Sequence, residues 1–468
     1  MLNENKINIK PLAILIAINL VYLFLFIIDS VEGIFALWIV FIFLSLLPFI
    51  IRDRRNIIAI IVFLIPFEVS KTFIPFFQVV EAKDGMFNSV FDFARLFMIY
   101  SFILWFLSDL KSLVPFVRHK ITYVLAIFIA FYLLSSLLIS PDLSKGLTET
   151  LRYVIYFLFF TMTISFIQKE EDFLLIFKVL ILVVFLLALE GIFEYLFDYY
   201  LWYDNGRRAS ATFLDPNIFA RFLVIVLISM IIFKLKNINV FKPQHMDIMI
   251  LVCGIALLLT VSRQGIVLFF LMMLFTVFFV KGRKRIFIIA ALLVIMAISI
   301  PVFIQLMAIR ERGLELYDIG QRSGLLLGAV LMFISNPLLG IGAGGFQQTL
   351  IGSYYDFLPW GIHGDTLSHT YILTILAEQG LVGFTVFTFF LFFVYQQFII
   401  NYRINNLKLK TYTLVIFSVI LIIFISSQAE ARFFEEPLLW LFLGLLVALG
   451  RLNKNRRKNL PEENGEEV

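Results

Sequence analysis

The stretch PNIFARFLVIVLISMIIF, residues 216–233, decides the class of the fold. It is apolar along almost its whole length, and as a helix it is long enough to cross the roughly 30 Å hydrocarbon layer of a bilayer. Similar runs recur from one end of the chain to the other, so that 61% of the 468 residues are hydrophobic and only 15% are charged. An aqueous core could not hide so many apolar runs, which excludes a soluble protein. Because the runs are continuous rather than alternating, they exclude a β-barrel as well.

We therefore predict an all-α protein, a polytopic transmembrane helix bundle with about 12–14 spans. The predicted spans lie near residues 11–28, 33–51, 57–80, 90–107, 121–140, 148–167, 173–197, 216–233, 246–261, 265–280, 286–306, 380–400, 411–429 and 436–450. Pro66 and Pro75 interrupt the third of them. A broken or re-entrant helix is the alternative there, since protein or water can cover the freed backbone.

Lysine and arginine set the predicted orientation, because cytoplasmic segments carry an excess of both. Most of the 38 lysines and arginines fall in segments on the side of the N-terminus, which predicts that both termini are cytoplasmic. The outer segments favour arginine over lysine. The planar fork of arginine matches phosphate oxygens, although ordinary surface or ion-pairing arginines would give the same bias.

The spans and loops divide the chain into five predicted regions. These are an N-terminal transmembrane bundle at 1–200, transmembrane helices with outer arginine turns at 201–306, a large extracytoplasmic loop at 307–370, C-terminal transmembrane helices at 371–450 and a cytoplasmic polar tail at 451–468. Loops beyond about 15 residues are usually functional or disordered. The long loop contains a predicted amphipathic helix at 323–335, so we expect one large, ordered helical loop on the outer face.

One outer connection has the features of an anion-binding site. Asp215, followed by Pro216 and Asn217, is a typical start of a helix. Arg207 and Arg208 come shortly before it. A helix N-terminus beside arginines can bind an anion, and a simple capped helix is the alternative.

Two further arginines lie on the predicted outer side. Arg263 is the only charge of VSRQG, residues 261–265, a tight turn between two spans, and Arg322 begins the amphipathic helix. The glycine-rich stretch GIGAGGF, residues 340–346, follows a helix and Pro337 rather than a strand, so it fails as a dinucleotide fingerprint. Its glycines instead indicate close backbone packing or close approach to a ligand.

The stretch SHTYILTILAEQGLVGF, residues 368–384, places one of only four histidines at the outer end of a helix. His369 could simply anchor that helix end, but it also ends the long loop, on the face where the arginines gather. Histidine is the side chain whose ordinary pKa permits proton transfer near neutral pH. Gly380 and Gly383 predict that a short helix carrying Glu378 stops here and that the next span begins at an angle.

Charged residues also occur within predicted spans, on one helix face: Asp92 with Arg95, Glu149 with Arg152, and Glu190 with Glu194. Charges inside a membrane generally mark a cavity or pathway, and structural pairing between helices is the alternative. The sequence has no zinc-ligand spacing, no Walker loop and no Asp-x-Asp motif. We therefore predict no metal site, no cofactor and no nucleic-acid partner.

Four motifs together resemble the O-antigen ligase and polysaccharide polymerase superfamily, over about residues 200–390. They are R-x-S-x-T-F-x-x-P-N, an S-R-x-G turn, an arginine-bearing helix that leads into N-P-L-x-G-x-G-x-G-x-F, and SHTYILTILAEQGLVG. The resemblance implies a metal-independent, inverting glycosyltransfer on the outer face of the bacterial cytoplasmic (inner) membrane. The donor would be a glycan on undecaprenyl diphosphate.

The resemblance also implies roles for particular residues. Arg208, Arg263 and Arg322 would bind the diphosphate, where preorganised positive charge suits the departing group. Arg322 and His369 would be catalytic, with His369 accepting or positioning the proton of the acceptor hydroxyl. The family often has Gly where this chain has Ala211. Supporting candidates are Arg207, Asp215, Asn217, His363 and Glu378.

Within the superfamily we favour a polymerase that joins repeat units of an exported surface polysaccharide. One alternative is an O-antigen-type ligase that transfers the finished glycan to a lipid or protein acceptor. Another is a lipid-linked oligosaccharide flippase or other transporter, which would use the charges within spans and need no outer histidine. The expected partners are the undecaprenyl-diphosphate-linked oligosaccharide, a glycan or lipid acceptor, membrane lipids, a flippase and a chain-length regulator.

Overall fold

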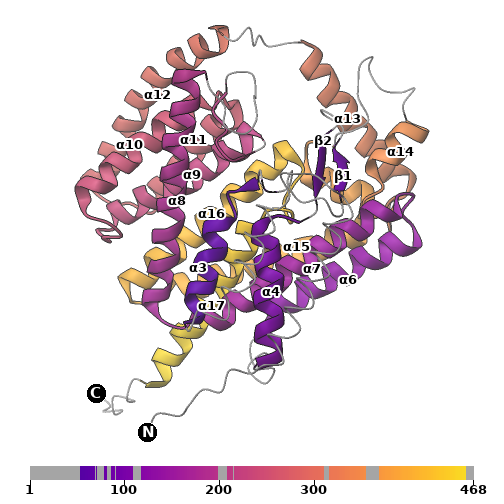
Figure 1. Ribbon diagram of the computed structural model, residues 1–468, viewed down its shortest axis with the longest axis horizontal. Helices are drawn as coiled ribbons and strands as arrows, with labels where there is room; N and C mark the ends of the chain where they lie inside the picture. Colours follow the sequence, from indigo (N-terminus) through magenta and orange to yellow (C-terminus); the bar gives the residue numbers. More distant parts are fainter. Residues whose placement is uncertain are drawn as a thin grey trace, which may run out of the picture.

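A computed structural model describes residues 53–68, 70, 78–81, 86–89, 91–108, 118–198, 208–213, 215–309, 316–354 and 368–459. The predicted spans 11–28 and 33–51 lie outside these residues. The described part of the chain is almost entirely helical (Figure 1). Its helices are α3 (Arg54–Leu64), α4 (Phe93–Ser108), α6 (Lys120–Leu138), α7 (Leu143–Phe166), α8 (Glu170–Phe197), α9 (Pro216–Leu235), α10 (Pro243–Leu259), α11 (Arg263–Phe278), α12 (Arg283–Ile309), α13 (Leu316–Ser335), α14 (Phe346–Ser353), α15 (Tyr371–Tyr402), α16 (Leu407–Glu430) and α17 (Pro437–Asn459).

Six of these helices are long and apolar enough to cross a membrane: α6, α8, α9, α15, α16 and α17 from Pro437 to Lys454. Four shorter apolar helices, which include α10 and α11, accompany them. The predicted all-α, polytopic membrane bundle is therefore confirmed. The described residues also include one antiparallel pair of short strands, β1 (Gln78–Glu81) and β2 (Met86–Ser89), which was not predicted.

The predicted span at 57–80 is not one continuous helix. Helix α3 ends at Leu64, and residues 78–81 form strand β1. Pro66, which has no N–H to donate to a continuing helix, follows the C-cap residue Ile65. Its carbonyl instead accepts a hydrogen bond from the Thr212 hydroxyl at 2.8 Å. The interruption expected at this proline is confirmed.

Helix α16 lies in the middle of the bundle, where it packs against α9, α11, α15 and α17 (Figure 1). Helix α9 is the most enclosed of the six long helices, since 83% of its most apolar window is buried within the protein, against 44% for α6. Leu134, Leu137 and Leu138 of α6 are exposed. Such an exposed apolar face is what a helix at the lipid boundary requires.

Successive helices alternate in direction, so that one end of the bundle collects the connections that the sequence singled out. We call it the site end, formed by residues 208–213, 260–264, 340–346, 368–374 and 431–436. Hydrogen bonds described below join 208–213 to 260–264 and attach 260–264 and 368–374 to the end of α16. The opposite end holds the first residues of α6, α8, α10 and α16, and α17 ends there.

Candidate functional site

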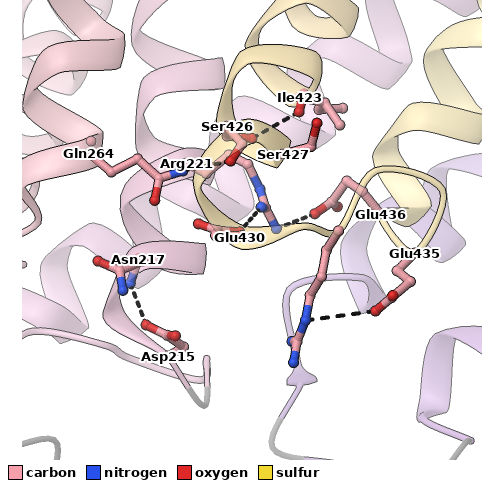
Figure 2. A network of polar contacts seen from close by, with 12 residues as sticks. Asp215, Asn217, Arg221, Gln264, Ile423, Ser426, Ser427, Glu430, Glu435 and Glu436 are labelled. Carbon is pink, nitrogen blue, oxygen red and sulfur yellow. Dashed lines mark hydrogen bonds and ion pairs between the residues drawn. The ribbon is translucent and has the colours of Figure 1, made fainter. Parts of the chain in front are cut away.

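The start of α9 has the predicted geometry. Asp215 caps the helix, its carboxylate accepting a hydrogen bond from the Asn217 N–H at 2.7 Å, and Pro216 occupies the first helical position. Figure 2 shows Asp215 and Asn217 side by side at this helix start. The carboxylate therefore satisfies a backbone donor that the helix leaves without an internal partner.

Arg208 is tied to two neighbouring elements of the site end. Its Nε donates to the Thr260 carbonyl at 2.8 Å, and its Nη2 donates to Oδ1 of Asn217 at 3.1 Å. The Ser262 hydroxyl donates to the same Asn217 oxygen at 2.9 Å. Arg208 is buried, with 6% of its surface exposed. The fold thus brings Arg208 and Asn217 together with the turn before α11.

Glu194 holds the backbone beside Arg208. Its Oε2 accepts hydrogen bonds from the N–H groups of Ser210 (3.1 Å) and Ala211 (2.9 Å), and the residue is fully buried. Ala211 has a positive φ of 49°, a conformation in which glycine is favoured. The family's frequent glycine at this position therefore has a backbone reason, and Glu194 has a structural role.

The SRQG turn begins α11 as predicted. Ser262 caps the helix by accepting from the Gly265 N–H at 3.1 Å, and Arg263, the first helical residue, is exposed. Gln264 reaches α16, where its side-chain amide donates to the Ser426 carbonyl at 3.0 Å (Figure 2). One side of the end of α16 is thus attached to the arginine-bearing turn.

The segment that begins with His369 also reaches the end of α16. The N–H of Ile372, three residues later, donates to Gln428 Oε1 of α16 at 3.5 Å. His369 is half-buried and has a positive φ of 62°. The fully buried Ser368 fixes this turn, because its hydroxyl donates to the Thr370 carbonyl (2.8 Å) and accepts from the Thr370 N–H (3.2 Å). Backbone conformations of this kind occur often at functional sites.

Arg322 is exposed on α13. This helix begins at Leu316, not at 323 as predicted, so Arg322 lies in its second turn rather than at its start. Helix α13 packs against α15, which His369 precedes, but no described contact joins the Arg322 side chain to His369 or to the other arginines. Arg207 and His363 lie outside the described residues.

The glycine-rich segment packs into a break in α15. Gly380 has a φ of 61° and a ψ of −160°, which interrupts the helix where the sequence predicted. A side chain on Gly340 would come within 2.3 Å of the Glu378 backbone. The predicted role of these glycines in close backbone packing is confirmed.

Backbone hydrogen bonds are exchanged at this break. The N–H groups of Leu381 and Val382 donate to the carbonyls of Pro337 and Leu338 rather than to the preceding turn of α15. The carbonyls left over on Ala377 and Glu378 accept from Ile341 and Gly342, at 2.9 and 3.0 Å. Glu378 completes the junction, because Oε1 accepts from the Phe346 N–H at 3.1 Å.

Sequence reasoning missed a buried network centred on Arg221. Its guanidinium bridges Glu430, at the end of α16, and Glu436, just before α17 (Figure 2). Burial raises the pKa of the Glu436 carboxyl, and the neighbouring Arg221 opposes this shift. An arginine inside the apolar run 216–233 was the available signal, but nothing in the local pattern names its partners.

A second ion-pair network contains Arg152 of α7. Its Nη1 lies 3.0 Å from Glu149 and 3.2 Å from Glu435, and Arg432 lies 3.8 Å from Glu435. Within α4 and its cap, Arg95 pairs with Asp92 at 3.5 Å. The predicted pairs at Asp92 and Glu149 are therefore structural ion pairs, as their alternative reading proposed. Among the described residues, no group of three or more His, Cys, Asp or Glu side chains could hold a metal ion.

Comparison with protein families supports the predicted resemblance. A family model described as O-antigen ligase matches residues 248–388, which include Arg263, Arg322, His369 and Glu378. No curated protein matches the chain. The family indicates ligation or polymerisation of glycans at a membrane, with lipid-linked glycan and acceptor substrates. Over residues 248–388, the chain is therefore similar to the O-antigen ligase family, which supports the resemblance to the O-antigen ligase and polysaccharide polymerase superfamily.

Proposed function

We propose that the protein is a metal-independent, inverting glycosyltransferase that polymerises repeat units of a surface polysaccharide. The donor is a glycan on undecaprenyl diphosphate, and the acceptor is a hydroxyl on a second glycan. One observation carries this proposal: the arginine-bearing turn before α11 and the segment that follows His369 are both attached to the end of α16, at Ser426 and Gln428. A charge site for a diphosphate and a proton acceptor are then held at the same helix end.

The leaving group explains the arginines. Negative charge develops on the diphosphate as its bond to the anomeric carbon breaks, and fixed positive charge stabilises it. Arg263 contributes a guanidinium at the N-terminus of α11, where the helix dipole also favours an anion. We assign Arg208 and Arg322 to the same diphosphate, with Asn217 orienting Arg208 and Asp215 capping α9.

The acceptor explains the histidine. The acceptor oxygen attacks the anomeric carbon, its proton passes to the His369 ring, and the bonding electron pair leaves with the diphosphate. A neutral imidazole suits this transfer near neutral pH. The contacts of Ser368 with Thr370 hold the backbone turn from which the His369 side chain projects.

We place the site end on the outer face of the bacterial cytoplasmic membrane, with both termini in the cytoplasm. Lysines gather at the opposite end of the bundle, where Lys120 begins α6, Lys169 precedes α8 and Lys408 lies in the first turn of α16. Positive charge of this kind favours the cytoplasmic side. Arg207 and His363 remain candidate supporting residues of the site.

Ligation of a finished glycan to a lipid or protein acceptor is the second candidate function, and the description of the matching family favours it. The transporter alternative has less support. It would use charges within the spans, but Asp92 and Glu149 are each engaged by an arginine of the same helix.

The deciding experiment is a gel profile of lipid-linked and surface glycan from the native host, comparing wild type with His369→Ala at matched protein level. His245→Ala is the control, since His245 is exposed near the start of α10, at the opposite end of the bundle. Single repeat units left on the carrier identify a polymerase. Long chains stranded on the carrier identify a ligase. A profile like that of wild type refutes both.

A further inference from the structure

A narrow pocket opens at the site end, beside the segment that carries His369. It lies between α6, α7, the first turns of α15 and the loop before α17, and its wall includes Tyr132, Tyr153, Tyr371, Lys145, Glu149 and Glu435. None of these residues is among those assigned above to the diphosphate or to proton transfer. Glu378 closes the wall on the α15 side.

The three tyrosines have buried rings and unused hydroxyls. Tyr132, Tyr153 and Tyr371 are 4–5% exposed, and the rings of Tyr132 and Tyr153 pack edge to face at 5.0 Å. Phe434 packs against the rings of Tyr153 and Tyr371. Within the described residues, none of the three hydroxyls has a hydrogen-bond partner. Buried tyrosine hydroxyls normally have one, so the pocket offers three polar groups that a ligand can satisfy.

The charged residues of the wall are held in place from behind. Arg152 holds Glu149 and Glu435 at 3.0 and 3.2 Å. Lys145 donates to Gln347 of α14, and the Phe346 N–H donates to Glu378. The wall thus combines fixed carboxylate acceptors with hydroxyl and ammonium groups. Neighbouring hydroxyls of a sugar, each both donor and acceptor, match this combination.

The position of the pocket relates it to the acceptor rather than to the donor. Tyr371 follows His369 by two residues, and Glu378 lies about 10 Å further along the same helix at 1.5 Å per residue. This length is comparable to one or two sugar units. The arginine-bearing turn, in contrast, contacts α16 from the side of α9 and α11 through Gln264.

We propose that this pocket is an acceptor subsite, which binds non-reacting hydroxyls of the acceptor sugar while the reacting hydroxyl reaches His369. This subsite rests on the proposed glycosyltransfer, and it assigns the non-reacting part of the acceptor sugar to the pocket wall. The pocket accepts the hydroxyl-bearing edge of a polyol.

The test removes single hydroxyls and leaves the rings. Tyr153→Phe and Tyr371→Phe are compared with Tyr156→Phe, whose hydroxyl accepts from Arg95 Nε at 2.9 Å instead of lining the pocket. The purified full chain in nanodiscs receives a labelled lipid-linked donor from the host. The soluble acceptor is the repeat-unit oligosaccharide released from its carrier by mild acid.

We expect each of the two pocket variants to raise the KM for this oligosaccharide about 3- to 10-fold, the effect of one lost hydrogen bond. The KM for the donor and the thermal midpoint should stay near wild type. Tyr156→Phe should leave the acceptor KM unchanged. Wild-type acceptor KM in both pocket variants, with His369→Ala inactive, would overturn the subsite, leave the proposed function intact and identify the pocket as a water site.

A second readout separates the two proposals. Saturation-transfer NMR measures binding of the same oligosaccharide without turnover. If His369→Ala retains full activity, the proposed function fails, and the subsite then stands or falls on this binding. Signal lost in Tyr153→Phe and kept in Tyr156→Phe would support it, and equal signal in both would refute it.

Discussion

Replacing Arg221 by alanine tests whether the site end depends on its buried arginine. Arg221 is 4% exposed, and its guanidinium contacts Glu430 and Glu436 together. Its removal leaves two buried carboxylates without their cation. Breaking a buried pair in this way costs about 3–5 kcal/mol. For a chain of 468 residues, an unfolding entropy of about 2.1 cal/mol/K per residue converts this loss to about 3–5 °C in the thermal midpoint.

The assay is thermal unfolding of the purified protein in one detergent, with Lys234→Ala as the control. Lys234 pairs with Asp247, but both side chains are more than half exposed, so the loss there should be at most about 1 kcal/mol. Arg221→Lys should fall between wild type and Arg221→Ala, because one ammonium cannot reproduce the two-pronged contact. The reasoning is refuted if Arg221→Ala melts no lower than Lys234→Ala.

Four further predictions concern the site and the loop beside it. Arg322→Lys should lose nearly as much glycan transfer as Arg322→Ala, because a point charge cannot replace the fork, and full activity of the lysine variant would contradict a bidentate contact. Transfer by the purified protein should persist in excess EDTA, and strong inhibition would contradict the metal-independent mechanism. Gly340→Ala should lower the free energy of unfolding by about 2–5 kcal/mol, since its Cβ would meet the Glu378 backbone, whereas Gly254→Ala, with open space around it, should be tolerated in the same melt. Ala211→Gly should raise that free energy by up to about 1 kcal/mol through relief of the positive φ, and a lower thermal midpoint would show that the backbone is unstrained.

The sequence predicted the features that depend on local chemistry. The cap at Asp215, the turn at 261–265 and the break at Gly380 all follow from residues within a few positions of one another, and the structure has each of them. The start of α13 was predicted too late. Its first turn, at Leu316, has neither the cap nor the apolar periodicity that would have marked it.

Contacts between segments far apart in the chain could not be predicted from local sequence patterns. Arg221 is 209 residues from Glu430 and 215 from Glu436, so their meeting depends on how α9, α16 and α17 pack. Glu378 was predicted as a supporting residue of the site, but its described contact is with the backbone that begins α14. The sequence predicted which single residues are charged or polar within the spans. It did not predict the distant residues with which they pair.

The exchanged hydrogen bonds at the break in α15 restrict which segments can be swapped between this protein and a related one in a chimera. The carbonyls of Ala377 and Glu378 depend on amides of the glycine-rich segment, and the amides of Leu381 and Val382 depend on its carbonyls. A buried backbone amide or carbonyl that loses its hydrogen-bond partner destabilises the fold, because no water replaces that partner. The glycine-rich segment and α15 therefore depend on each other. A chimera that imports a foreign outer loop must therefore carry residues 336–346 and 371–382 as one cassette. The glycine-rich segment and the first part of α15 have to be exchanged together.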